Sequence, residues 1–205
     1  MFTGIVTAIG SITKVEQRGD TRLTIAAALD PELIAIGASI ACSGVCLTVV
    51  DRGGIKGDAW FSVDVSAETI RCTMPDMWQS GQRLNIEPSL RVGDEIGGHI
   101  VTGHIDAVGT VVMAEQEGGS IRLGIRAPSQ MAPFIAPKGS ITINGVSLTV
   151  NEVADQADGS CDFFLNIIPH TGEVTTLGGL TIDDPVNLEI DVLARYLKRM
   201  QSLAD

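Results

Sequence analysis

Phe2-Thr3-Gly4-Ile5-Val6-Thr7-Ala8-Ile9-Gly10 returns 99 positions later as Val101-Thr102-Gly103-His104-Ile105-Asp106-Ala107-Val108-Gly109. The similarity resumes where Ser39-Ile40-Ala41-Cys42-Ser43-Gly44-Val45-Cys46-Leu47-Thr48-Val49 matches Ser140-Ile141-Thr142-Ile143-Asn144-Gly145-Val146-Ser147-Leu148-Thr149-Val150, and where Leu84-Asn85-Ile86-Glu87 matches Val186-Asn187-Leu188-Glu189. Because the offset grows only from 99 to 102, chance similarity of composition does not explain the match. The sequence therefore predicts two copies of one small domain, which could hold two similar molecules.

Length and charge fit two compact acidic domains. The chain has 205 residues, enough for two units of about 100 residues that each bury a modest core. Lys and Arg total 14 against 25 Asp and Glu, so the net charge of -11 repels a phosphate backbone. Only 4% of residues are aromatic, too few for base stacking. We therefore expect no nucleic-acid partner.

The chain carries no signal for an export route or a membrane. No uncharged apolar run approaches the length that crosses a bilayer, and the first residues lack the basic opening of a signal peptide. The four cysteines show neither CxxC spacing nor a disulfide framework, which favours reduced thiols over disulfides or a zinc site. We expect a cytoplasmic protein with no membrane partner.

Period-two alternation of apolar and polar residues predicts an all-β fold. It is clearest at 22–25, 60–65, 120–125 and 162–167, and glycine-containing turns separate such stretches. About six short strands per half, without a βαβ rhythm, indicate a closed or nearly closed antiparallel barrel, because closure removes exposed sheet edges. Short helical pieces are expected after Asp30-Pro31-Glu32 and within 127–133, at equivalent places in the repeat.

The predicted domains are 1–96 and 97–190, with a boundary in the turn-rich stretch from Arg91 to Gly98. Residues 191–205 have no counterpart in the first half and read as a helix. Its apolar residues fall on one face, at Leu193, Tyr196, Leu197, Met200 and Leu203. This face either packs on its own barrel, the usual arrangement for a terminal helix, or pairs with copies of itself.

Two matching strands carry small polar side chains. Alternation places Cys46 with Thr48 on one face, and Ser147 with Thr149 on the matching face of the other half. Such side chains often only satisfy the backbone inside a narrow barrel. The Asn144-Gly145 step, however, allows a turn with positive φ that would bring the backbone of Ser147 close to a ligand.

The two halves differ at positions that matter for proton transfer and charge. His104 replaces Ile5, so only the second repeat has a titratable group there. His99 and His104 are five residues apart without a thiol or acidic partner, which matches no familiar metal spacing, and we expect no metal site. Lys138 replaces Gly37; it is either an ordinary solvated lysine or one that reaches over a neighbouring pocket.

Several motifs together resemble the riboflavin synthase family of the α-chain type. They are the opening Met1-Phe2-Thr3-Gly4-Ile5-Val6, the Gly-Val-Cys-Leu-Thr-Val stretch from Gly44, Gly97-Gly98-His99-Ile100-Val101-Thr102-Gly103-His104-Ile105, Ile168-Pro169-His170-Thr171 and Thr175-Thr176-Leu177. The resemblance covers the whole chain. It implies two tandem homologous six-stranded antiparallel Greek-key barrels and a C-terminal helix that builds a homotrimer.

The activity that the resemblance implies is a dismutation of two 6,7-dimethyl-8-ribityllumazine molecules. A four-carbon unit passes between them and gives riboflavin and 5-amino-6-(D-ribitylamino)uracil, the last step of riboflavin biosynthesis, with no cofactor. The productive pair is implied to form where the first barrel of one subunit faces the second barrel of its neighbour. Lumazine synthase is a further partner that the resemblance brings into consideration.

The resemblance implies binding residues in both barrels. The first-barrel pocket would use Gly4, Ile5, Val6, Cys46, Leu47, Thr48, Asp64, Val65, Ser66, Ala67, Glu68 and Thr69. The second would use Gly103, His104, Ile105, Ser147, Leu148, Thr149, Asn166, Ile167, Ile168, Pro169, His170 and Thr171, and Lys138 would contact the ligand of the adjacent subunit.

Little catalytic apparatus is needed for this chemistry. The conjugated ring acidifies the 7-methyl protons of the lumazine, so the protein mainly aligns two rings and helps protons to move. Cys46, His104 and Ser147 are the candidates for that help. The residues leave open whether the thiol acts as a nucleophile, a proton donor or a simple contact. The competing interpretation is a non-catalytic lumazine- or flavin-binding chromophore protein of the same architecture.

Overall fold

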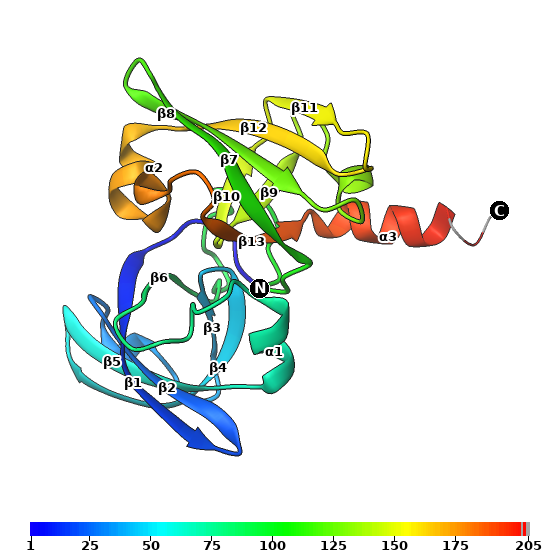
Figure 1. Ribbon diagram of the computed structural model, residues 1–205. Coiled ribbons are helices and arrows are strands. Elements are labelled where there is room, and N and C mark those ends of the chain that lie inside the picture. Colours follow the sequence, from blue (N-terminus) through cyan, green and yellow to red (C-terminus); the bar gives the residue numbers. More distant parts are fainter. Residues whose placement is uncertain (202, 204–205) are drawn as a thin grey trace.

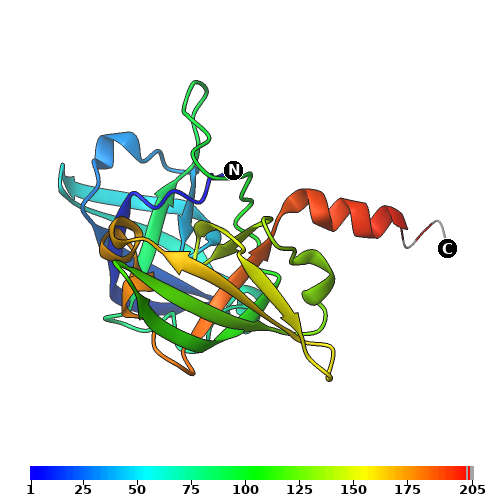
Figure 2. The same cartoon turned by 90° about the horizontal axis from the view of Figure 1, so that it is seen from above.

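A computed structural model describes residues 1–201 and 203 of the chain. Figure 1 shows two strand-built units, one above the other, with the N-terminus between them. Helix α3 (Val192–Gln201) projects away from both units, and in Figure 2 the turn-rich segment that joins them extends as a loop. No helix within residues 1–201 and 203 is long and apolar enough to span a membrane.

The first unit is a closed barrel with the strand order β1-β2-β5-β4-β3-β6. Alternation decides which face is inside: Leu23 and Ile25 are fully buried, whereas Arg22 and Thr24, which alternate with them, are only half-buried. The connections from β2 to β3 and from β5 to β6 each skip two strands, which is a Greek-key arrangement. The strands are β1 (Ala8–Arg18), β2 (Asp20–Ala27), β3 (Ser39–Cys42), β4 (Val45–Ile55), β5 (Asp58–Val65) and β6 (Arg83–Pro88).

The second unit repeats this arrangement with seven strands, in the order β10-β9-β13-β7-β8-β12-β11. The extra strand arises where β4 has a register shift between Val49 and Asp51; at the matching place the second unit breaks the strand in two. The predicted all-β tandem barrels are thus confirmed. The strands are β7 (Ala107–Glu117), β8 (Ser120–Ala127), β9 (Ser140–Ile143), β10 (Val146–Thr149), β11 (Glu152–Asp155), β12 (Cys161–Ile167) and β13 (Pro185–Ile190).

The helical pieces also occur in matching pairs. The two predicted from proline positions are single 3-10 turns, and Asp30 caps the first of them through its side chain. The sequence did not predict two short α-helices, one after β5 in the first unit and one after β12 in the second. The helices are η1 (Pro31–Leu33), α1 (Ala67–Cys72), η2 (Ala132–Phe134), α2 (Pro169–Val174) and η3 (Thr176–Gly179).

The two barrels meet back to back through equivalent turns. Gly44 and Gly145 both have positive φ, and a Cβ on Gly145 would lie 2.6 Å from the amide nitrogen of Gly44. The Asn144-Gly145 turn therefore supports the contact between barrels. The amide of Ser147 donates to the carbonyl of Gly4, and the expectation that the turn brings the backbone of Ser147 close to a ligand stays a prediction.

Two asparagines lock this contact in a reciprocal way. The side-chain amide of Asn85 donates to the carbonyl of Asn144 at 2.9 Å, and that of Asn187 donates to the carbonyl of Ser43 at 3.0 Å. Both asparagines are buried, so these bonds would be costly to break. The two barrels are consequently fixed relative to each other by an approximate two-fold relation.

Helix α3 is anchored by polar side chains: at its base by two hydrogen bonds, and farther along by Lys198, which lies 4.6 Å from the centre of the Phe134 ring. Asp191 accepts from the amide of Leu193 at 2.9 Å, and the guanidinium of Arg195 donates to Asp106 at 2.9 Å. The expectation that the apolar face packs on its own barrel is wrong, because its residues are 61–70% exposed. They are Leu193, Tyr196, Leu197, Met200 and Leu203, called the helix stripe below; residues 202, 204 and 205 of the predicted helical segment lie outside the described part.

Candidate functional site

The two repeated opening segments are each held by a buried glutamate of their own half. Glu87 accepts hydrogen bonds from the amides of Thr3 and Gly4 at 2.7 and 3.0 Å. Glu189 accepts in the same way from Thr102 and Gly103, at 2.6 and 2.9 Å. Burial raises the pKa of both carboxyls, and these hydrogen bonds oppose the rise. Each glutamate thus fixes the path of the segment that opens its repeat.

Each opening segment crosses to the other half at its glycine. The carbonyl of Gly103 accepts from the amide of Cys46 at 2.8 Å, and the carbonyl of Gly4 accepts from the amide of Ser147 at 2.9 Å. Both glycines have positive φ, and a Cβ on either would lie 2.5 Å from the Cβ of its partner. Only glycine permits this approach. The sequence analysis grouped Gly4 with Cys46 and Gly103 with Ser147. The structure contradicts this grouping, because Gly103 lies beside Cys46 and Gly4 lies beside Ser147.

The side chains after the glycines follow the same exchange. Ile105 packs against the core of the first barrel, and Val6 packs against the core of the second. A cavity of about 190 Å³ lies at the first of these crossings, and we call it the Cys46 pocket. Its lining residues are Val45, Cys46, Glu68, Thr69, Cys72, Thr73, Gly103, His104 and Ile105.

Helix α1 supplies one wall of the Cys46 pocket. The hydroxyl of Ser66 caps it by accepting from the amide of Thr69 at 3.2 Å. Glu68 pairs with Arg71, and it accepts from the thiol of Cys72 at 3.3 Å. These partners lower the pKa of Glu68, the Cys72 contact most. The wall therefore presents hydroxyls, a thiol and an ionised carboxylate.

The equivalent crossing in the other half we call the Ser147 site. Ser147, Gly4 and the segment after Gly97 meet there: a Cβ on Gly98 would lie 2.8 Å from the hydroxyl oxygen of Ser147. The Ser147 hydroxyl is hydrogen-bonded to Nδ1 of His99 at 2.7 Å. Cys46 with His104 and Ser147 with His99 therefore lie at two different crossings. The three predicted catalytic residues do not share one pocket.

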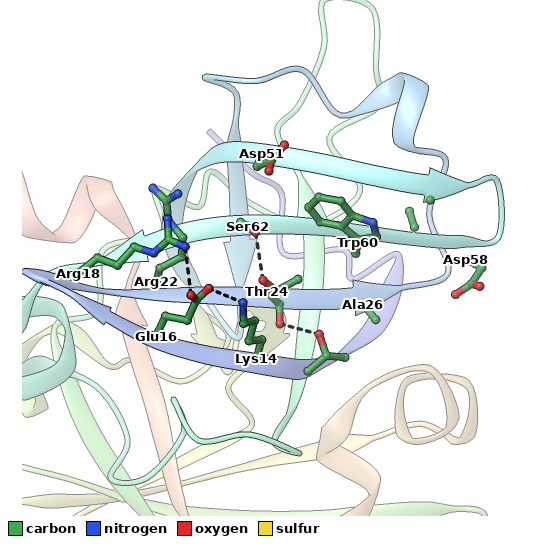
Figure 3. Close-up of a pocket in the computed structure, with 13 residues that line it drawn as sticks. Lys14, Glu16, Arg18, Arg22, Thr24, Ala26, Asp51, Asp58, Trp60 and Ser62 are labelled. Carbon is green, nitrogen blue, oxygen red and sulfur yellow. Dashed lines mark hydrogen bonds and ion pairs between the residues drawn. The ribbon is translucent and has the colours of Figure 1, made fainter.

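A groove larger than the Cys46 pocket lies elsewhere, on the outer face of the first barrel (Figure 3). It measures about 590 Å³, and none of the predicted site residues lines it. Some of its charged side chains pair with one another: Glu16 lies 3.0 Å from both Lys14 and Arg18. Such exposed ion pairs contribute little to stability. Within residues 1–201 and 203, no group of three or more His, Cys, Asp or Glu could hold a metal ion.

Comparison with known proteins decides the family. The model of the lumazine binding domain matches the chain twice, at residues 3–89 and 102–191. The chain belongs to the lumazine-binding domain family. Both matches begin at the threonine that the buried glutamate holds, so each copy of the lumazine-binding domain includes its own crossing segment.

Individual relatives of this family resemble the chain over nearly its full length. The riboflavin synthase of Brucella abortus (strain 2308) is 48% identical over 98% of each chain, and that of Mycobacterium tuberculosis (strain ATCC 25618 / H37Rv) is 41% identical over 100% of each. The crystal structure of LumP complexed with riboflavin covers 93% of this chain and 99% of its own, with a TM-score of 0.76 and 27% identity. LumP complexed with 6,7-dimethyl-8-(1'-D-ribityl) lumazine gives a TM-score of 0.73 and 26% identity.

Several residues expected to bind in these lumazine-binding domains are not among those that line the Cys46 pocket. Leu47, Val65 and Ile167 belong to the buried cores. Asp64 is held outside the barrel by Arg22, through two bonds of 2.8 and 2.7 Å that lower its pKa. Asn166 accepts from Asn151 and donates to Glu117. The side chains of these five residues do not face the Cys46 pocket.

Lys138 occupies a backbone position that does not suit lysine. Its φ is 66°, while Gly37 at the matching position has φ of 84°. In both cases the backbone amide donates to a backbone carbonyl: Lys138 to that of Val150, and Gly37 to that of Val49. A left-handed conformation costs a side-chain-bearing residue about 1 kcal/mol or more. The side chain of Lys138 is exposed.

The sequence analysis missed the residues that shape the crossings. Glu87 and Glu189 are carboxylates in largely buried strands, at matching places in the repeat. A buried carboxylate is rare without partners, so this repeated pair was a readable signal. The bond between His99 and Ser147 had no such signal, because 48 residues separate them.

Proposed function

We propose that this protein is a riboflavin synthase, a transferase that dismutates two 6,7-dimethyl-8-ribityllumazine molecules to riboflavin and 5-amino-6-(D-ribitylamino)uracil. One observation carries the proposal: the two crossings are built from the same parts, each combining a strand of one half with the opening glycine of the other. Matching sites in one chain suit two identical substrates. The full-length relatives named riboflavin synthase, 41–48% identical, favour the same activity.

The size of the Cys46 pocket supports a site that a second subunit completes. Its 190 Å³ is below the roughly 300 Å³ at which pockets enclose a drug-sized ligand, so one face of the heterocycle stays uncovered. That face is free to stack on a second lumazine held by a neighbouring subunit. Holding the two rings in contact supplies most of the rate enhancement by proximity.

The helix stripe supports the proposed homotrimer. Five large apolar side chains that are more than 60% exposed form a continuous face, and burying it against copies of itself would remove that area from water. Lys138 would then reach the ligand of the adjacent subunit. The proposal keeps the division into barrels at 1–96 and 97–190 and an oligomerisation helix at 191–205.

The proposed chemistry uses the side chains at the two crossings. Backbone groups and Thr48, Thr69 and Thr149 bind the pyrimidine edge and the ribityl hydroxyls, while Cys46, His104 and Ser147 assist proton movement at the acidified methyl group. The proposal involves no cofactor. The four free cysteines fit the reducing interior of a cell, which supports a cytoplasmic location.

A chromophore carrier is the second candidate, because the LumP structures hold riboflavin and a lumazine in the same fold. The two candidate functions are distinguished by incubating the purified protein with 6,7-dimethyl-8-ribityllumazine alone. Formation of riboflavin supports the synthase. Tight binding of the lumazine without riboflavin would support the carrier and overturn the proposed activity.

A further inference from the structure

His99 makes a hydrogen bond at each nitrogen of its ring. Nδ1 lies 2.7 Å from the hydroxyl of Ser147 on β10, and Nε2 lies 3.2 Å from the hydroxyl of Thr142 on β9. Ser147 and Thr142 are direct neighbours across the two strands, so the imidazole spans two side chains of one sheet face. The backbone of His99 is fixed as well, because its amide donates to the carbonyl of Thr3 at 3.2 Å.

The first half has a different chemistry at the same positions. Cys46 and Ala41 pair across β4 and β3 where Ser147 and Thr142 pair across β10 and β9. In the first half these two residues pack with Phe2 and Val101 in a small apolar cluster. The two hydroxyls and the imidazole of the second half thus form one unit: both hydroxyl residues differ from their first-half equivalents, and His99 has no counterpart in the first half.

The surroundings of His99 keep its ring neutral. Burial lowers the pKa of the imidazole, and Asp191 beyond β13 opposes this with its charge. Glu189 pairs with Thr142 from β13, but its carboxylate is turned to Thr102 and Gly103. A neutral imidazole has one N–H, and the hydrogen bond at one nitrogen sets the role of the other. With Nε2–H donating to Thr142, Nδ1 accepts from the Ser147 hydroxyl.

We propose that His99, in the tautomer that donates Nε2–H to Thr142, is a positioning residue that makes the Ser147 hydroxyl a proton acceptor at the second crossing. The inference rests on the proposed function. As the Ser147 oxygen takes a proton from the acidified methyl carbon of the lumazine, its own proton passes to Nδ1. The substrate becomes a carbanion and His99 an imidazolium. The proton returns by the same route in a later step, so no oxidant or further reactant is needed.

The test follows proton removal separately from riboflavin formation. In deuterated buffer, loss of the 7-methyl proton signal of 6,7-dimethyl-8-ribityllumazine is measured by NMR, with and without protein. His99→Asn and Ser147→Ala are each expected to reduce the protein-catalysed exchange about 100-fold, with substrate affinity within threefold of the original. The double variant should lose no more than either single variant, because the two residues act as one unit.

Two further readouts separate positioning from folding. The acid limb of log kcat against pH should disappear in His99→Asn, since no imidazole remains to be protonated. Thr142→Val should slow exchange and Thr142→Ser should restore it, a pair that serves also where His99→Asn fails to fold. Additive losses, an unchanged acid limb, or equal rates in the two Thr142 variants would overturn the inference. If the protein catalyses proton exchange but forms no riboflavin, the inference about His99 stands and the proposed synthase activity is refuted.

Discussion

The amide of Cys46 donates to the carbonyl of Gly103 at 2.8 Å, from the first barrel to the opening segment of the second. Gly4 and Ser147 make the equivalent bond in the opposite direction. Neither crossing can therefore form in an isolated half of the chain. Gene duplication usually yields two self-contained sites, but this exchange makes each site depend on both repeats.

Replacing the buried glutamates should disturb the crossing of the opposite half. Glu189→Gln puts an amide N–H against the donors of Thr102 and Gly103, so the amide of Cys46 loses its fixed acceptor. Glu87→Gln should act on Ser147 instead, and each change should cost about 1–3 kcal/mol of unfolding free energy. Amide shifts of Cys46 and Ser147 in ¹⁵N NMR spectra check this. Each variant is the control for the other, and equal effects on both amides would refute the crossed dependence.

Lys138→Gly should separate stability from activity. Glycine relieves the strain at φ of 66°, so the unfolding free energy should stay the same or rise by about 1 kcal/mol. The loss of one charged contact to the ligand, worth about 1.5 kcal/mol, should lower kcat/KM roughly tenfold. Lys138→Ala is the matched control, which keeps the strain but loses the ammonium group. Full activity in both variants would remove Lys138 from the site.

The folded protein should lose part of its stability as the pH falls below 6.5. The lowered pKa of His99 means that the unfolded chain binds a proton at higher pH than the folded one. This contribution is complete above the ordinary histidine pKa and is lost as the pH falls through the folded value. Urea unfolding of the original protein and of His99→Asn at pH 7.5 and 5.0 isolates it, because other titrating groups are common to both. If the unfolding free energy of both proteins changes by the same amount between pH 7.5 and 5.0, the neutral imidazole of His99 is contradicted.

If the protein forms the proposed trimer, deleting residues from Asp191 onward should convert that trimer to monomers. The helix stripe is the apolar face that the deletion removes, and Leu197→Glu should weaken assembly in the same direction. Gln201→Glu adds the same charge beside the stripe and is the control. Sedimentation velocity checks the assembly state. An intact trimer after truncation would remove α3 from the interface.

The architecture was accessible to sequence reasoning because its signals are local. Burial of Leu23 and Ile25 beside half-buried neighbours follows from alternation alone, and the repeat transfers the same inference to Leu123 and Ile125. The terminal helix was predicted from its periodicity. What covers its stripe was not, because periodicity identifies an apolar face but not its partner.

The arrangement of the site was less accessible, because it depends on contacts between distant residues. Assigning Gly4 to the first pocket and Gly103 to the second was the natural choice for a repeat, yet the two segments exchange places. The cause lies in pairs such as Glu87 with Gly4, which are 83 positions apart and leave no periodic pattern. The pairing of Asp64 with Arg22 was inaccessible for a similar reason, since 42 positions separate them.

The most direct test of the account is the stoichiometry of a reaction with one substrate. Purified protein is given 6,7-dimethyl-8-ribityllumazine alone, and riboflavin and 5-amino-6-(D-ribitylamino)uracil are quantified as the lumazine disappears. Two paired sites predict that two lumazine molecules are consumed for each riboflavin and each uracil product formed. Stable binding of lumazine with neither product would contradict it.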